Sequence, residues 1–226
     1  MRTQRGRWLD SDPVVVVPLP RAGRHRRPAS GACLMELVSA VTGQVWNDHP
    51  PAVHPTLGVL ARHVNDLLST DQQRRRLLAL VPHLLDTASA DAGMTGAVAL
   101  PVLHAAAAVS SADRPRRALV GLDAASSLLA APTRAPRRTV ARHTLRVHRA
   151  MRQAVRALVA GSAEPRRTDD MLVDLLRESS CRSKPAWRPR CRRIGERSAR
   201  AIGGRAAPRA DRLAARRTAG DALHVR

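Results

Sequence analysis

Residues 30–85 read SGACLMELVSAVTGQVWNDHPPAVHPTLGVLARHVNDLLSTDQQRRRLLALVPHLL, and this stretch decides the fold. Ser30 is a residue type that caps helices, and apolar residues follow it at three- and four-residue spacing. Gly43 suits the left-handed exit of that helix. The adjacent prolines Pro50 and Pro51 cannot continue a helix, so the chain is expected to form a loop there.

Two further helices are predicted within the same stretch. Pro55 suits the first position of the second helix, and a stripe of apolar residues runs along residues 57–68. Thr70 and Gln73 form the pattern of a capping box, which starts a third helix that Pro82 interrupts. The stretch therefore predicts three short helices with tight connections.

The composition favours an all-α fold for the rest of the chain. The sequence has no Phe or Tyr and three Trp, and Ala and Leu dominate its apolar residues. We expect a small irregular bundle of six or seven short helices over residues 30–178. The later helices are expected from Gly96 with Thr95 as its cap, from Asp113, over residues 137–159, and from Thr168.

Both ends of the chain have a different composition. Residues 1–29 mix Arg, Pro and Gly around the run VVVVPLP, and acidic residues and prolines exclude a signal peptide, so we predict a disordered basic leader. Residues 179–226 contain few large apolar residues and are predicted to be a disordered Arg-rich tail. No stretch approaches the roughly 20 apolar residues that span a membrane, so a cytoplasmic location is expected.

The net charge of +21 invites a nucleic-acid interpretation. More than half of it lies after residue 175, however, and Lys184 is the sole lysine. An excess of arginine over lysine is what GC-rich coding produces without any ligand. The total charge is therefore weak support for binding.

Four segments carry a resemblance to a known family: GACLMELVS, TGQVWNDHP, HPTLGVLARHVNDLLS and LVPHLL. Their order of CLME, DHP, HP and VND resembles a family of helical proteins of unknown biochemistry from high-GC actinobacteria and their phages. The resemblance covers about a quarter of the chain. Family members often have a Cys where this chain has Ala52, so the resemblance implies a lineage and no reaction.

One group of side chains could carry chemistry: Cys33, Glu36, Asp48, His49 and His54. Cys33 lies in a first helical turn, where the helix dipole is expected to lower its pKa, and His54 could act as its partner in catalysis. Cys33, His49 and His54 could instead hold zinc. In the third interpretation, which the irregular spacing favours, Cys33 is a buried structural residue and the histidines bind the loop.

A second candidate is a stripe of arginines along the helix predicted at residues 137–159. By helical periodicity its members gather opposite the apolar side, and they are Arg138, Arg142, Arg146, Arg149, Arg152 and Arg156. Such a stripe can contact phosphates nonspecifically, lie on anionic lipid, or simply face solvent. No aromatic residue interleaves with it, so stacking on bases is excluded.

The remaining polar residues are expected to have no site of their own. Cys181 and Cys191 fit neither a zinc knuckle nor a disulfide framework. Asp169 and Asp170 are adjacent, so they point in different directions and do not form an acid/base pair. A last set on the second helix could face the histidine-bearing loop, but solvation is the favoured interpretation: Arg62, His63, Asn65 and Asp66.

Two function classes follow from these patterns. The favoured one is a non-enzymatic helical binding or regulatory module with an unidentified protein partner, no cofactor, and nonspecific nucleic-acid affinity through its arginine-rich surfaces. The alternative is a small enzyme or zinc protein centred on Cys33, His49 and His54.

Overall fold

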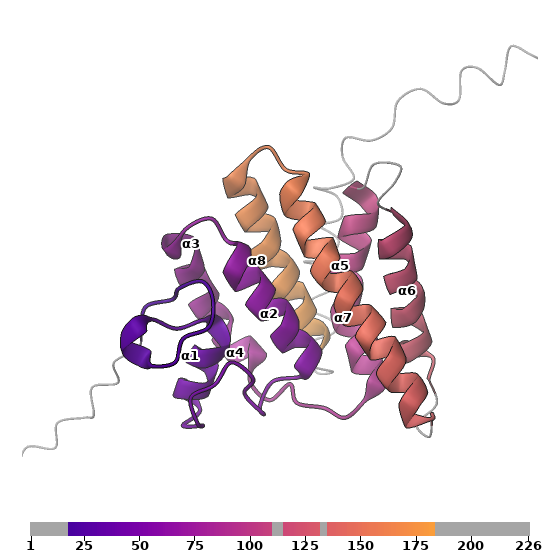
Figure 1. Cartoon of the computed structure of the whole chain (residues 1–226), viewed down its shortest axis with the longest axis horizontal. Helices are drawn as coiled ribbons and strands as arrows, with labels where there is room; N and C mark the ends of the chain where they lie inside the picture. Colours follow the sequence, from indigo (N-terminus) through magenta and orange to yellow (C-terminus); the bar gives the residue numbers. More distant parts are fainter. Residues whose placement is uncertain (1–17, 110–114, 132–134, 184–226) are drawn as a thin grey trace, which may run out of the picture.

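The structure, a computed structural model, describes residues 18–109, 115–131 and 135–183 (Figure 1). Within these ranges the predicted all-α fold is confirmed, and the only β pairing is an isolated bridge between Pro20 and Ala32. The helices are α1 (Leu34–Val41), α2 (Pro55–Leu67), α3 (Asp71–Arg75), α4 (Val81–Leu84), α5 (Ala92–Val109), α6 (Pro115–Leu129), α7 (Arg137–Ala160) and α8 (Pro165–Arg182), with 3₁₀ turns at Pro28–Ser30 and Arg76–Leu80.

Helix α1 starts later than predicted. Its N-cap is Cys33, whose sulfur accepts a hydrogen bond from the Glu36 N–H at 3.4 Å, while the Glu36 carboxylate accepts one from the Cys33 N–H at 2.7 Å. This reciprocal capping box replaces the cap expected at Ser30, which belongs to a 3₁₀ turn. Gly43 follows α1 with a φ of 65°, the left-handed exit that the sequence predicted.

Helices α2 and α3 begin where the sequence placed them. Pro55 occupies the first turn of α2, and Thr70 Oγ1 accepts a hydrogen bond from the Gln73 N–H at 3.2 Å. The third predicted helix is instead divided into α3, a 3₁₀ turn and α4, with Pro82 in the first turn of α4. A first turn tolerates proline because backbone N–H groups at these positions have no helical partner, so nothing is lost when proline lacks one.

Helices α5 and α8 begin earlier than the predicted caps. Helix α5 starts at Ala92, and Thr95 lies inside it, where its hydroxyl contacts Thr56 of α2. Helix α8 starts at Pro165, and Thr168 donates its hydroxyl to the Glu164 carbonyl one turn back. Both threonines therefore lie inside their helices and are not caps. Asp113, the predicted start of α6, lies outside the described residues.

The helices form two groups that share α2 and α8. Helix α5 packs against α6, α7 and α8, and α2 lies between α1 and the α7–α8 pair (Figure 1). The core is aliphatic, and Leu57, Leu103, Leu172 and Met151 are at most 1% exposed. Among the described segments, no helix is long and apolar enough to cross a membrane.

Close approach of α6 to α7 depends on Gly121. A Cβ at this position would lie 2.5 Å from Ala150 Cβ and 2.9 Å from Leu103 Cδ2. We therefore expect Gly121→Ala to lower the free energy of unfolding by about 1–3 kcal/mol, because the helices must separate to admit the methyl group. Urea unfolding followed by circular dichroism measures this change.

Gly58 of α2 supplies the matched control. A Cβ there would meet only ordinary contacts, at 3.5 Å from Arg62 Nη1 and 3.7 Å from Met35 Sδ. Gly58→Ala is expected to raise stability by about 0.5–1 kcal/mol, since alanine is the better helix former. Equal effects of the two substitutions would contradict close packing at Gly121.

The predicted disordered leader is wrong for residues 18–29, which are ordered in the structure. Residues 18–33 form a strap across α1 and α2, and we call this segment the N-terminal strap. The Arg21 N–H donates to the Ala32 carbonyl at 2.9 Å, and the Asn65 side-chain amide donates to the Arg21 carbonyl at 2.9 Å. Backbone pairing therefore orders a segment whose side chains are mostly exposed, while residues 1–17 lie outside the described residues.

The predicted boundary of the basic tail at residue 179 is also wrong. Helix α8 continues to Arg182, and Ser179, Ser180 and Cys181 are at most 6% exposed. The low apolar content of the segment therefore did not prevent its burial. The rest of the predicted tail, residues 184–226, lies outside the described residues.

Candidate functional site

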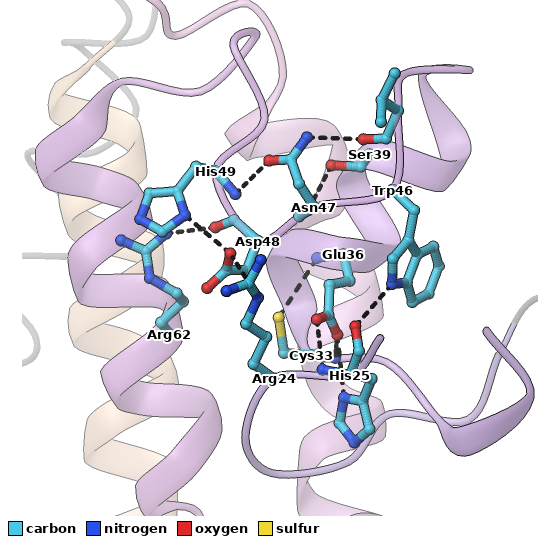
Figure 2. Close-up of polar contacts among 11 residues, drawn as sticks. Arg24, His25, Cys33, Glu36, Ser39, Trp46, Asn47, Asp48, His49 and Arg62 are labelled. Carbon is cyan, nitrogen blue, oxygen red and sulfur yellow. Dashed lines mark hydrogen bonds and ion pairs between the residues drawn. The ribbon is translucent and has the colours of Figure 1, made fainter. Parts of the chain in front are cut away.

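Glu36 is the centre of a buried polar cluster where the N-terminal strap meets α1 (Figure 2). Its side chain has no exposed surface. The carboxylate accepts hydrogen bonds from the N–H groups of His25 at 2.6 Å and Cys33 at 2.7 Å, and His25 Nδ1 lies 3.0 Å away. Trp46 Nε1 donates to the His25 carbonyl at 2.9 Å, which fixes the strap from its other side.

Cys33 has the environment of a structural thiol. It is 2% exposed, and burial raises its pKa to about 12 even though backbone N–H groups of Glu36 and Met35 oppose this shift. The predicted lowering of the Cys33 pKa by the helix N-terminus is therefore wrong in direction. A thiol with this pKa is protonated at neutral pH, and the thiol is a poor nucleophile compared with the thiolate.

His49 lies apart from Cys33, on an exposed loop, and its partner is Asp48. The His49 ring Nδ1 is 2.9 Å from Asp48 Oδ1, and Arg24 Nε is 3.4 Å from the same oxygen (Figure 2). Burial raises the pKa of Asp48, but the hydrogen bond from His49 and the charges of His49 and Arg24 outweigh it and hold the pKa below its ordinary value. The Asp48 charge is thus paired with His49 of the same loop and with Arg24 of the strap.

His54 caps α2. Its ring Nδ1 accepts a hydrogen bond from the Thr56 N–H at 3.3 Å, and the backbone N–H of His54 donates to Thr87 Oγ1 at 3.0 Å. Burial lowers the pKa of His54, and the nearby charge of Asp91 only partly offsets this. A buried neutral imidazole that caps a helix has a structural role.

The three predicted zinc ligands therefore have three different sets of partners. Cys33 contacts Glu36, His49 contacts Asp48, and His54 contacts Thr56 and Thr87. Within the described part of the chain, no group of three or more His, Cys, Asp or Glu side chains has the arrangement of a metal site. The residues are close in sequence, but the fold does not gather them as one ligand set.

A contact between α2 and α7 was not anticipated. His148 Nε2 lies 2.8 Å from Thr56 Oγ1, and that hydroxyl also lies 3.2 Å from Thr95 Oγ1. Burial lowers the pKa of His148 to about 4, and the nearby charges of Arg152, His54 and Arg62 act in the same direction. His148 lies on the edge of the predicted arginine stripe, and periodicity alone did not distinguish it from a surface residue.

The six arginines of α7 lie opposite its buried side, as periodicity predicted, and we call them the arginine face. Five are exposed, and Arg152 is half-buried beside α2. None of the six forms an ion pair with a described residue. The exposed members are Arg138, Arg142, Arg146, Arg149 and Arg156.

The four polar residues of α2 that were expected to be solvated behave differently. Asn65 is fully buried, and its Oδ1 accepts from the Leu34 N–H at 3.2 Å. Arg62 and His63 are half-buried, and only Asp66 is exposed, where it accepts from the Gly23 N–H at 2.8 Å. The strap contacts α2 at Asn65 and Asp66, and this contact was not predictable because residues 18–29 were expected to be disordered.

The two adjacent acids of α8 point in different directions, as predicted. Asp169 is 2% exposed, and its Oδ1 accepts from the Ser69 N–H at 3.0 Å, whereas Asp170 pairs with Arg76 at 2.7 Å. Asp169 therefore joins α8 to the end of α2. Cys181 is buried near the end of α8, and Cys191 lies outside the described residues.

An open cavity of about 530 Å³ lies beside the start of α2. Three prolines form part of its wall, together with Gly58 and Arg62 of α2 and the exposed residues 88–90. Neither Cys33 nor His54 lines it. The cavity is thus separate from the predicted catalytic pair.

Comparison of the chain with protein-family models, curated protein sequences and solved structures found no match. The resemblance to an actinobacterial family therefore stays a prediction that rests on the four quoted segments.

Proposed function

We propose that this protein is a non-enzymatic helical binding module whose arginine face contacts the phosphate backbone of a nucleic acid. The observation that carries the proposal is the arginine face itself: five exposed arginines along one side of α7 without an ion-pair partner among the described residues. Guanidinium groups left unpaired on a rigid helix are available to phosphates.

The dimensions of α7 suit this partner. From Arg138 to Arg156 the helix rises about 27 Å at 1.5 Å per residue, which equals the rise of about eight base pairs of duplex DNA. The α7 helix is anchored on its buried side through Val147, Met151 and Leu158, so the arginines are held in line. Several of them can therefore meet successive phosphates at once.

Binding of this kind is nonspecific. No aromatic residue is interleaved with the arginines for stacking on bases, so affinity comes from charge and counterion release. The proposal keeps the cytoplasmic location expected from the sequence. The alternative of a Cys33 enzyme has no support from the site, because its thiol is buried, protonated and used as a helix cap.

The test is the salt dependence of binding to a 20-base-pair duplex, measured by fluorescence anisotropy with the full chain. Replacing Arg142, Arg146 and Arg149 together by Gln is expected to weaken binding at low salt. The slope of log K against log salt concentration should fall by about 1 for each lost phosphate contact.

A matched control removes the same charge elsewhere on the described surface. Arg75, Arg166 and Arg167 are exposed and form no ion pair among the described residues, so their combined change to Gln is expected to leave the slope nearly unchanged. If both triple variants reduce the slope equally, total charge and not the arginine face governs binding.

A further inference from the structure

We infer that the cavity beside α2 is a binding site for a small monocarboxylate with a compact apolar body, whose carboxylate pairs with Arg62. This inference is independent of the proposed nucleic-acid contact. It stands on the shape and lining of the cavity and on the state of the Arg62 guanidinium.

The size and lining of the cavity suit a small organic molecule. Its volume of about 530 Å³ is within the usual range of ligand pockets. The wall is mostly apolar, through Pro50, Pro51, Pro55 and Val53. Such a wall favours an aromatic or branched aliphatic body over a bare ion.

Arg62 supplies the charge that selects an anion. Its Nη1 donates to the Asp48 carbonyl, and Arg62 forms no ion pair with a described residue. The guanidinium is half-buried, and the charges of Asp48 and Asp66 act on it from beyond ion-pair distance, so its remaining N–H donors are partly removed from water without a directly paired carboxylate. A ligand carboxylate in the cavity would satisfy them through charge-assisted hydrogen bonds.

The Asp48 carboxylate, whose charge acts on Arg62, does not fill this role. Asp48 is 8% exposed, does not line the cavity, and is paired with His49 and Arg24 (Figure 2). Asp91, next to the cavity rim, accepts from the Gly93 N–H at 2.9 Å at the start of α5. Both acids are therefore engaged elsewhere.

Gly58 leaves the floor of the cavity open. Its neighbours would accept a Cβ at ordinary distances of 3.5 and 3.7 Å, and its φ is not in the left-handed region. Neither the backbone nor the helix packing requires glycine at this position. The missing side chain thus contributes space on the surface next to Arg62.

The experiment titrates the full chain with benzoate and follows the amide resonances by two-dimensional NMR. We expect saturable shifts at Val53, Gly58 and Ser89 and none at Arg149 of the arginine face. Benzamide has the same shape without the charge, and acetate has the charge without the ring. Both are expected to bind at least tenfold more weakly than benzoate.

Two variants locate the site. Arg62→Gln removes the charge, and Ala90→Phe fills the exposed rim without touching Arg62; each is expected to weaken benzoate binding at least tenfold. Arg75→Gln on α3, outside the cavity and outside the arginine face, is the control and should leave the affinity unchanged. The inference is overturned if benzamide binds as tightly as benzoate, if Ala90→Phe has no effect, or if the shifts map to α7.

Discussion

Replacing Glu36 by Gln is expected to lower the free energy of unfolding by about 3 kcal/mol. The buried carboxylate accepts hydrogen bonds from the N–H groups of His25 and Cys33 and contacts the His25 ring. An amide has one acceptor oxygen, and its NH₂ group would face a donor, so a buried N–H loses its partner. Urea unfolding at neutral pH measures the loss.

The control for this substitution is Glu164→Gln. Glu164 is exposed and makes no side-chain cap bond at the start of α8, so the same chemical change is expected to cost about 0.5 kcal/mol or less. A further measurement separates local loss of structure at the strap from unfolding of the whole protein. In Glu36→Gln the fluorescence of Trp46 should change before global unfolding, because its Nε1 contact to the strap depends on His25. Equal costs for the two variants would contradict a central role of Glu36.

Lowering the pH from 6.5 to 4 is expected to destabilise the protein, with His148 contributing about 2 kcal/mol. The pKa of His148 is about 4 in the folded chain against 6.5 for a free imidazole, because the ring is buried and positive charges surround it. Between these values only the unfolded chain takes up the proton. The stabilisation is therefore complete above pH 6.5 and is lost as the pH falls to 4, in an amount reduced by partial solvent access.

His54 and His63 shift in the same direction, since burial lowers both pKa values and Arg156 and Arg152 add to the effect at His63. Substituting His148 by Gln should flatten the dependence of unfolding free energy on pH in this range by about half. The exposed His104 of α5, changed to Gln, serves as the control and should leave the slope unaltered. An unchanged slope in His148→Gln would show that protonation of this ring does not drive acid unfolding.

Most helix positions could be predicted because their signals are local. Proline at the first turn of α2, the Thr70 cap and the left-handed Gly43 each depend on a few neighbouring residues. Errors occurred where a distant segment supplied a competing partner. The local pattern at Thr95 predicts a cap, yet its hydroxyl contacts Thr56 across the interface, and no local pattern distinguishes these two uses of a threonine.

The candidate site could be predicted only in part. A glutamate three residues after Cys33 is the capping-box spacing with sulfur in place of oxygen, so this contact was readable from the sequence. The separation of Cys33, His49 and His54 in space could not be predicted from the sequence, because it depends on how the loop crosses α1 and α2. For Arg62 the sequence favours solvation over contact with the histidine-bearing loop, because long charged side chains are usually solvated, yet its Nη1 donates to the Asp48 carbonyl of that loop. Only the three-dimensional path of residues 88–90 places a cavity beside it.

The N-terminal strap has a practical consequence for the design of shortened versions of the protein. Its arginine-, proline- and glycine-rich composition invites removal of everything before Gly31, or fusion of an affinity tag at that point. Such a cut would delete the His25 N–H, which donates to the Glu36 carboxylate. The fully buried carboxylate would then have half of its acceptors unmet. Any fragment meant to keep the fold should therefore begin at or before Pro18.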